Sequence, residues 1–146
     1  MKPRAILLII AALLFTTQAL AEMKSVRVKT ANFREGPSDS EDVLFTADRH
    51  YPVKILERKR GWAKIKDFEG ETAWVAERLL AQQKAIVVTV ERVVVRDKPD
   101  VKGKSVFQAN WSDAFAVKQE RNGWVLIEGP GGKEGWVSRD STWGIE

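Results

Sequence analysis

The chain contains no cysteine, which excludes disulfide bonds and thiolate metal sites. It has a single histidine, His50, so histidine-dependent chemistry would rest on one loop residue, and we expect His50 to be a solvated loop side chain. A permanent membrane span needs about 20 apolar residues, and the one long apolar run covers only residues 5–15. Because disulfides and thiolate metal sites are excluded, the fold must be held together by packing alone.

The first 21 residues have the pattern of an export signal. Lys2 and Arg4 precede the apolar run, and the small residues Ala19 and Ala21 stand at the spacing of a signal peptidase site. We therefore expect residues 1–21 to be a signal peptide cleaved after Ala21, and a periplasmic or secreted chain without stable membrane insertion. Without Lys2 and Arg4 the chain has 22 basic and 20 acidic residues, interspersed, which argues against a nucleic-acid partner.

The sequence is duplicated. With a shift of 62 residues and no gap, residues 26–80 fall onto residues 88–142. Identical pairs include Arg34/Arg96, Pro37/Pro99, Phe45/Phe107, Gly61/Gly123, Trp62/Trp124, Ile65/Ile127, Gly70/Gly132, Trp74/Trp136 and Val75/Val137. A repeat of this length is a domain, so we expect one domain at residues 22–83 and a second at residues 84–146.

Short strand patterns dominate both copies. In the first copy they cover residues 26–28, 43–46, 53–56, 62–66 and 73–75, with Gly and Pro between them. Five short antiparallel strands in so small a unit predict an all-β, nearly closed barrel. Residues 76–80 suit a single helical turn, and residues 84–88 suit a last strand that closes the first barrel.

One set of motifs resembles the bacterial SH3-like (SH3b) domain. These motifs are Phe33-Arg34-Glu35-Gly36-Pro37, Tyr51-Pro52-Val53, Gly61-Trp62, Gly70 and Trp74-Val75. The second copy departs from the pattern at Lys98 and at Asp113-Ala114, and the first has Ala73 in place of Gly135. The resemblance implies two tandem SH3-like five-stranded barrels that act as targeting or recognition modules, in several cases for cell-wall peptides. It implies no catalysis and no cofactor.

Strand alternation predicts that two tryptophans per copy face away from the core. If Ile65 and Val75 point inward, Trp62 and Trp74 point outward, and the same parity places Trp124 and Trp136 outward. A hairpin centred on Phe68 sets Trp62 opposite Trp74. Each pair is then either an aromatic shelf for an extended ligand, flanked in the first copy by Tyr51, or a cover for the end of a small barrel.

Two arginines and one acidic cluster are the other candidates. Arg34 and Arg96 suit either a clamp on a ligand carboxylate or a bond to a carbonyl of the adjacent turn. Asp39, Glu41 and Asp42 lack the glycine and the terminal glutamate of a calcium loop, so no metal site is expected.

The sequence predicts a non-enzymatic binding module for a peptidoglycan stem peptide or an extended peptide of an envelope protein. A periplasmic protein–protein scaffold that uses Trp111 and Trp143 is the alternative. An accessory of a cell-wall hydrolase or an enzyme is disfavoured, because neither copy holds a nucleophile with a base beside it. The sequence leaves the ligand and the oligomeric state open.

Overall fold

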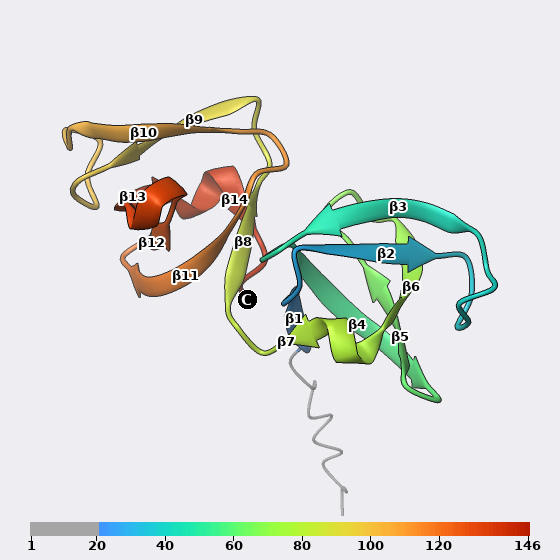
Figure 1. Cartoon of the computed structure of the whole chain (residues 1–146). Coiled ribbons are helices and arrows are strands. Elements are labelled where there is room, and N and C mark those ends of the chain that lie inside the picture. The colour runs from blue at the N-terminus through green and yellow to red at the C-terminus, as the bar shows by residue number, and fades with distance from the viewer. Residues whose placement is uncertain (1–20) are drawn as a thin grey trace, which may run out of the picture.

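The computed structural model describes residues 21–146, so the expected signal peptide lies outside the described residues except for Ala21. The elements of the described chain are fourteen strands and three short 3₁₀ turns (Figure 1). The first half contains β1 (Met23–Val26), β2 (Thr30–Arg34), β3 (Val43–Asp48), β4 (Pro52–Lys59), β5 (Trp62–Lys66), β6 (Thr72–Ala76), η1 (Glu77–Leu79) and β7 (Leu80–Ala81). The second half contains β8 (Ala85–Val88), β9 (Arg92–Arg96), β10 (Ser105–Asn110), β11 (Ala114–Arg121), β12 (Trp124–Glu128), η2 (Pro130–Gly132), β13 (Glu134–Ser138), η3 (Arg139–Ser141) and β14 (Thr142–Trp143).

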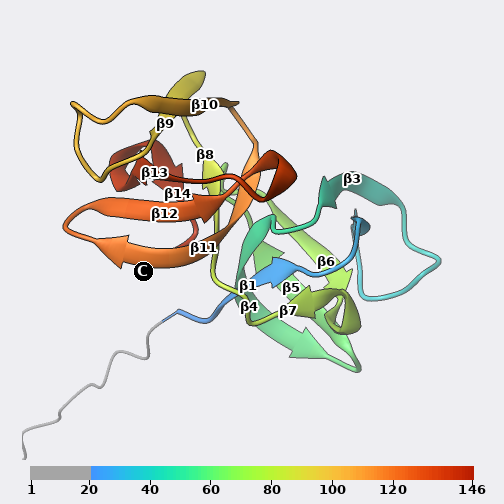
Figure 2. The same ribbon diagram turned by 60° about the vertical axis from the view of Figure 1, so that its left-hand side comes forward.

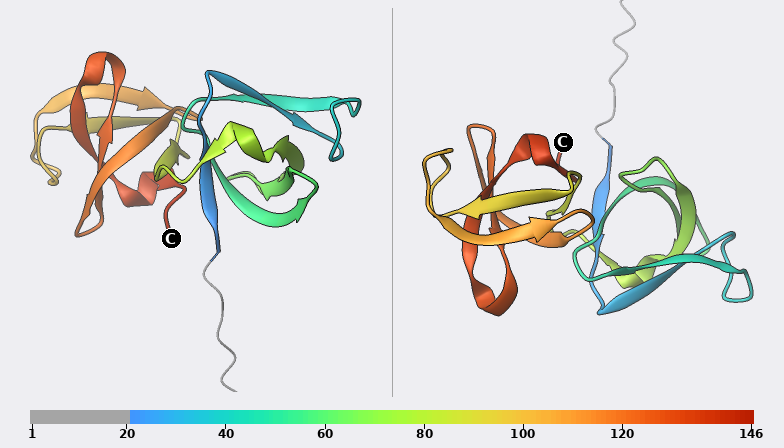
Figure 3. Two further views of the ribbon diagram at one scale, coloured as in Figure 1. Left: turned by 60° about the horizontal axis from the view of Figure 1, so that its bottom comes forward. Right: turned by 90° about the horizontal axis from the view of Figure 1, so that it is seen from above.

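The two halves form two antiparallel sheets of the same topology. The strand orders are β3-β2-β6-β5-β4-β1-β7 and β10-β9-β13-β12-β11-β8-β14, so every strand of the second sheet stands where the strand seven places earlier stands in the first. Each sheet curls round its own core (Figure 3), and the two lie side by side (Figures 1 and 2). The prediction of two all-β units is confirmed.

Two details of the predicted strands are wrong. Each sheet has seven strands rather than five. In the first sheet the prediction lacks β2 as a separate strand, and it lacks the short β7, which pairs with β1 after the 3₁₀ turn. The strand Ala85–Val88 does not close the first barrel, since it pairs with β11 and β14 of the second sheet. The helical turn expected near residues 76–80 is present as η1.

Each sheet encloses apolar side chains at alternate strand positions, as a pleated strand requires. In the first core Phe33, Ala63, Ile65 and Val75 are fully buried. The corresponding strands of the second core bury Val95, Val125, Ile127 and Val137. The repeated apolar residues therefore occupy equivalent positions in the two cores.

β8 connects the two barrels because both of its faces are buried. Ile86 and Val88 belong to the second core, whereas Val87 belongs to the first. This double burial explains the unbroken apolar run Ala85–Val88. Trp143, which has no aromatic counterpart in the first copy, also packs against the first core. The interface between the barrels is thus a continuation of the first core.

The C-terminal end tightens the same interface. Gly144 has φ of +135°, and a β-carbon on it would stand 2.4 Å from the Ala85 carbonyl oxygen and 2.9 Å from Pro52. The Lys54 ammonium lies 3.5 Å from the Glu146 carboxylate. Ser25 donates a 2.7 Å hydrogen bond to the Gln83 carbonyl and so ties the segment between the domains to the first barrel. The contacts of Gly144 and Glu146 hold the end of the second domain against the first barrel.

Candidate functional site

The predicted strand parity is confirmed for the tryptophans of the first copy. Ala63, Ile65 and Val75 are fully buried, while Trp62 and Trp74 occupy the alternate positions and are half-buried. In the second copy Trp124 is also half-buried. Trp136 departs from the expectation, since it is outside the core cluster yet only 9% exposed.

The predicted pairing of these tryptophans is wrong by two residues. Trp62 lies opposite Ala76, and Trp74 lies opposite Lys64. The turn is centred on Glu69 rather than Phe68. Within it the Asp67 carboxylate accepts the amides of Glu69 and Glu71 at 3.0 and 2.9 Å.

The second copy keeps this register. Trp124 lies opposite Ser138, and Leu126 lies opposite Trp136. In both copies the two indoles are diagonal neighbours on one face, not a directly facing pair.

Trp62 and Trp124 border equivalent surface hollows. The first hollow, of about 460 Å³, is bounded by Asp39, Gly61, Trp62, Ala76, Glu77 and Arg78. The second, of about 510 Å³, is bounded by Lys98, Pro99, Asp100, Arg121, Asn122 and Trp124. We call them the Trp62 hollow and the Trp124 hollow. Each lies between the β2–β3 or β9–β10 loop and the two-residue turn before the tryptophan, and Trp74 and Trp136 line neither.

The polar groups around the two hollows differ. The Trp62 hollow has Asp39 and Glu77 against Arg78. Glu77 is held by Arg58, whose Nε donates a 2.6 Å bond to it. The Trp124 hollow has Lys98 and Arg121 against Asp100. The two copies thus present the same ring with opposite balances of charge.

Arg34 and Arg96 make the carbonyl bond that one of the two sequence interpretations predicted. The Arg34 Nη1 donates to the Glu41 carbonyl oxygen at 2.8 Å, and the Arg96 Nη1 donates to the Gly103 carbonyl oxygen at the same distance. Each arginine therefore braces the loop that forms one wall of its hollow.

Tyr51 does not flank the tryptophans, which corrects the sequence expectation. Its ring packs edge-on against Phe33, Phe45 and Phe68 with centroids 6.2 to 6.5 Å apart, and it is 8% exposed. The hydroxyl donates to Asp67 Oδ2 at 3.3 Å. Burial, followed by the charge of Asp67, raises the pKa of Tyr51 above its ordinary value.

His50 is half-buried rather than fully solvated. It adopts φ of +73°, and its amide donates to the Val26 carbonyl at 2.8 Å. Ser112 repeats both features, with φ of +72° and a 2.9 Å bond to Val88. Burial first, then the neighbouring Arg49, lowers the pKa of His50. His50 and Ser112 have the same backbone geometry but different side chains, so the two copies share the turn and not the imidazole.

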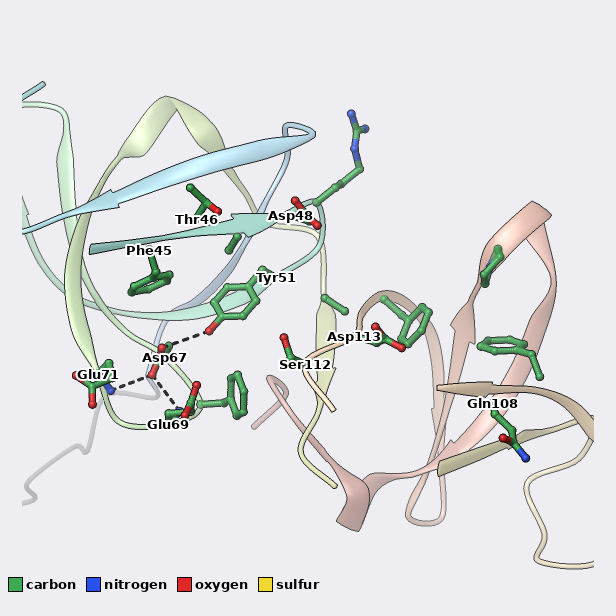
Figure 4. A pocket seen from close by; sticks show the side chains of 17 residues that line it. Phe45, Thr46, Asp48, Tyr51, Asp67, Glu69, Glu71, Gln108, Ser112 and Asp113 are labelled. Carbon is green, nitrogen blue, oxygen red and sulfur yellow. Dashed lines mark hydrogen bonds between the residues drawn. The ribbon is translucent and has the colours of Figure 1, made fainter. Parts of the chain in front are cut away.

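A third hollow, larger than the Trp62 and Trp124 hollows, was not predicted. It is a cleft of about 620 Å³ between the two barrels (Figure 4). The first barrel contributes β3, Tyr51 and the β5–β6 turn, and the second contributes the ends of β10 and β11 with the turn between them. No repeated motif marks it, because it is formed between the copies rather than within either.

The sequence matches the bacterial SH3 domain family over residues 29–81 and again over residues 91–142. The chain belongs to this family. Its two matches fall on the two sheets, so the protein carries two bacterial SH3 domains. No protein of curated function matches the sequence.

Solved structures similar to the tandem SH3 domains include NlpC1 and NlpC2 of Trichomonas vaginalis and an NlpC/P60 family protein of Bacillus cereus. Their sequence identities are 14%, 13% and 15%, with TM-scores of 0.39, 0.38 and 0.39. The matches cover 89%, 86% and 83% of this chain but 48%, 49% and 55% of the other chains. The chain therefore spans about half the length of these proteins.

Within residues 21–146 the structure has no helix of the length and apolar character that a bilayer crossing requires. The acidic residues Asp39, Glu41 and Asp42 do not converge: among the described residues no three His, Asp or Glu side chains are grouped as metal ligands would be.

Proposed function

We propose that the protein is an exported, non-enzymatic binding protein whose two SH3 domains bind extended peptides of the bacterial cell wall, such as peptidoglycan stem peptides. Membership in the bacterial SH3 domain family supports a binding role. The export pattern of residues 1–21, with cleavage after Ala21, supports a periplasmic or secreted location. Both domains would meet the same polymer there.

The observation that carries this proposal is the equivalence of the Trp62 and Trp124 hollows. Loop side chains around them have changed between the copies, but the half-buried indole, the bordering turn and the arginine that braces the loop are the same. An indole face with one exposed side suits a peptide backbone or an aliphatic side chain. Two such sites held at a fixed separation by the barrel interface raise affinity for a repeating polymer through avidity.

The test is retention on purified cell-wall sacculi. Residues 22–146 with Trp62→Leu and Trp124→Leu are expected to be retained about thirtyfold less than the parent, since each of the two changes removes an aromatic contact worth roughly 1 kcal/mol. The matched control is Trp74→Leu, which removes a half-buried indole from the same face of the first domain but outside the hollow. Equal retention of the double variant and the parent, with both folded by circular dichroism, contradicts the proposal.

The alternative function is a protein–protein scaffold that binds its partner through Trp111, Trp143 and the surface between the barrels. Trp143 packs against the first core, which leaves Trp111 as the accessible indole of that surface, 50% exposed with its other side against Phe68. Cross-linking in the periplasm separates the two functions, because a cell-wall binder enriches no single protein. Release of soluble muropeptides from sacculi by the purified chain would contradict the non-enzymatic part of the proposal.

A further inference from the structure

The cleft between the barrels has walls of two chemical kinds. Aromatic rings from both domains line it, among them the half-buried Phe45, Phe68, Phe107 and Phe115. Phe107 is held in place from behind, because its ring fills the space that a β-carbon on Gly129 would occupy. Rings placed in this way give a rigid apolar floor to which a hydrocarbon chain or the face of a cation can bind.

Carboxylates form the other kind of wall. Asp48, Glu69, Glu71 and Asp113 are exposed at the cleft, and the buried Asp67 lies beneath the Tyr51 hydroxyl (Figure 4). The only basic side chain among the lining residues is that of Arg49. None of the six ion pairs within residues 21–146 involves any of these five carboxylates.

This charge is opposite in sign to that of the whole chain, which has a formal net charge of +4. A cleft lined by one sign of charge between low-dielectric walls concentrates ions of the other sign. The cleft therefore favours a cation and disfavours an anionic ligand, even though the chain as a whole is basic.

The arrangement favours an organic cation over a metal ion. The cleft carboxylates do not gather into a set of three around one point, as a metal ion of the calcium type requires. They are spread over two domains, with aromatic rings among them. Ammonium groups on flexible chains suit this pattern, since the charge is met by separate carboxylates while the methylenes cover the rings.

The size of the cleft sets the length of the ligand. A volume of about 620 Å³ lies within the range of pockets that enclose small organic molecules or a few peptide residues. We infer that the interdomain cleft is a second binding site, separate from the Trp62 and Trp124 hollows, for a short extended peptide that carries primary ammonium groups on its side chains.

The probe is the peptide acetyl-Ala-Lys-Ala-Lys-Ala-amide, and its partner has both lysines acetylated. The pair differs in charge but hardly in backbone. Amide resonances of ¹⁵N-labelled residues 22–146 report where each peptide binds. We expect the lysine peptide to shift the resonances of residues 67–71 and 111–115, and the acetylated peptide to bind at least about fivefold more weakly.

The discriminating variant is Glu69→Gln with Glu71→Gln. Neither side chain forms a hydrogen bond or ion pair within residues 21–146, so the substitutions leave the fold intact. Binding of the lysine peptide is expected to weaken about fivefold. The matched control, Glu35→Gln with Asp42→Asn, removes two carboxylates outside the cleft and is expected to change binding less than about twofold.

Three results would each overturn the inference: shifts confined to residues outside the cleft or no shifts at all, equal binding of the acetylated peptide, and equal weakening in the control variant. The variant with Trp62→Leu and Trp124→Leu keeps the cleft and should bind the lysine peptide as the parent does. Failure of this inference is thereby distinguished from failure of the proposed cell-wall function, which is measured on sacculi.

Discussion

The ring of Phe68 in the first SH3 domain meets the indole of Trp111 in the second edge to face, with centroids 5.5 Å apart and planes at 63°. Phe68 belongs to the turn after β5, and Trp111 to the turn after β10. Neither residue has an aromatic counterpart in the other copy, where Pro130 and Arg49 stand. This contact between the barrels is therefore made by side chains that the repeat does not share.

This contact predicts an energetic coupling between the domains. Edge-to-face aromatic pairs contribute about 0.5–1.5 kcal/mol beyond burial, so Phe68→Leu and Trp111→Leu should destabilise the chain by less together than the sum of their separate effects. Urea unfolding of the four proteins in the double-mutant cycle measures this. As a control, Phe68→Leu and Trp124→Leu, which are not in contact, should add. Additivity in both cycles would show that the rings do not stabilise each other.

The repeat made the fold predictable, since the same turns and apolar positions occur twice and a single interpretation has to satisfy both copies. Ile65 and Ile127, and Val75 and Val137, lie in the cores as the strand parity predicts. The hairpin register differs from the prediction because it depends on the length and geometry of the turn, which the strand pattern does not encode; the second copy keeps the register with Gly129 in place of Asp67. The tryptophans were therefore placed on the correct face but paired wrongly.

The interdomain cleft was not predictable from the same signal. Its side chains come from turns and strand ends of both copies, and their approach depends on β8 burying Val87 in one core and Ile86 in the other. Tyr51 was misplaced for a related reason. Its position before Pro52 fits the family motif. The aromatic neighbours among which it is buried, Phe45 and Phe68, belong to other elements of the fold, so the residues next to Tyr51 in the sequence do not indicate this contact.

Tyr51 makes stability depend on pH in the alkaline range. Burial raises its pKa in the folded chain above the ordinary tyrosine value of about 10, so above about pH 10 the unfolded chain loses this proton while the folded chain keeps it. The free energy of unfolding then falls as pH rises, by at most about 1.4 kcal/mol per pH unit. Tyr51→Phe removes this dependence together with the bond to Asp67, which is worth about 1 kcal/mol.

We therefore expect Tyr51→Phe to be less stable than the parent by about 1 kcal/mol at neutral pH and to become equal to it near a pH of about 11. Urea unfolding at several pH values between about 8 and 11 measures the difference between the free energies of unfolding of the two proteins. Both contain the same lysines, so the effect of lysine titration cancels in this difference. Parallel curves for the two proteins over this range would mean that the Tyr51 proton is not held more tightly in the folded chain.

Gly135 is required where the first copy has Ala73. A β-carbon on Gly135 would stand 2.6 Å from Val95 Cγ1 and 3.1 Å from the Arg96 carbonyl oxygen. Gly135→Ala is expected to destabilise the second domain by about 1–3 kcal/mol, as overpacking of a core does. In a Val95→Ala background Gly135→Ala should cost less than in the parent, because the nearer clashing atom is gone.

The matched change in the first copy is Ala73→Gly. It creates no clash, and its cost should be only about 0.5–1 kcal/mol, through the added freedom of the unfolded backbone. Chemical denaturation followed by tryptophan fluorescence measures both. If Gly135→Ala and Ala73→Gly cost the same, or if Gly135→Ala costs as much in the Val95→Ala background as in the parent, the steric explanation is wrong.

The two-residue turns before Trp62 and Trp124 give the last prediction. Arg60 and Gly61 have φ of +50° and +84°, and Asn122 and Gly123 have +47° and +84°. Two positive φ values in a two-residue hairpin are those of a type I′ turn, for which Asn-Gly is strongly favoured. Arg60 bears the cost of a left-handed conformation, about 1 kcal/mol, that Asn122 largely avoids.

Arg60→Asn should therefore stabilise the chain by about 0.5–1 kcal/mol, and Asn122→Arg should destabilise it by a similar amount. Arg60→Gln separates conformation from charge, because it removes the guanidinium without the preference for positive φ, and its stability should equal that of the parent. Thermal unfolding of the three variants decides between the causes. If Arg60→Gln stabilises the chain as much as Arg60→Asn does, the gain comes from relief of charge repulsion in Arg58-Lys59-Arg60 and not from turn geometry. The destabilisation expected for Asn122→Arg would then have no basis.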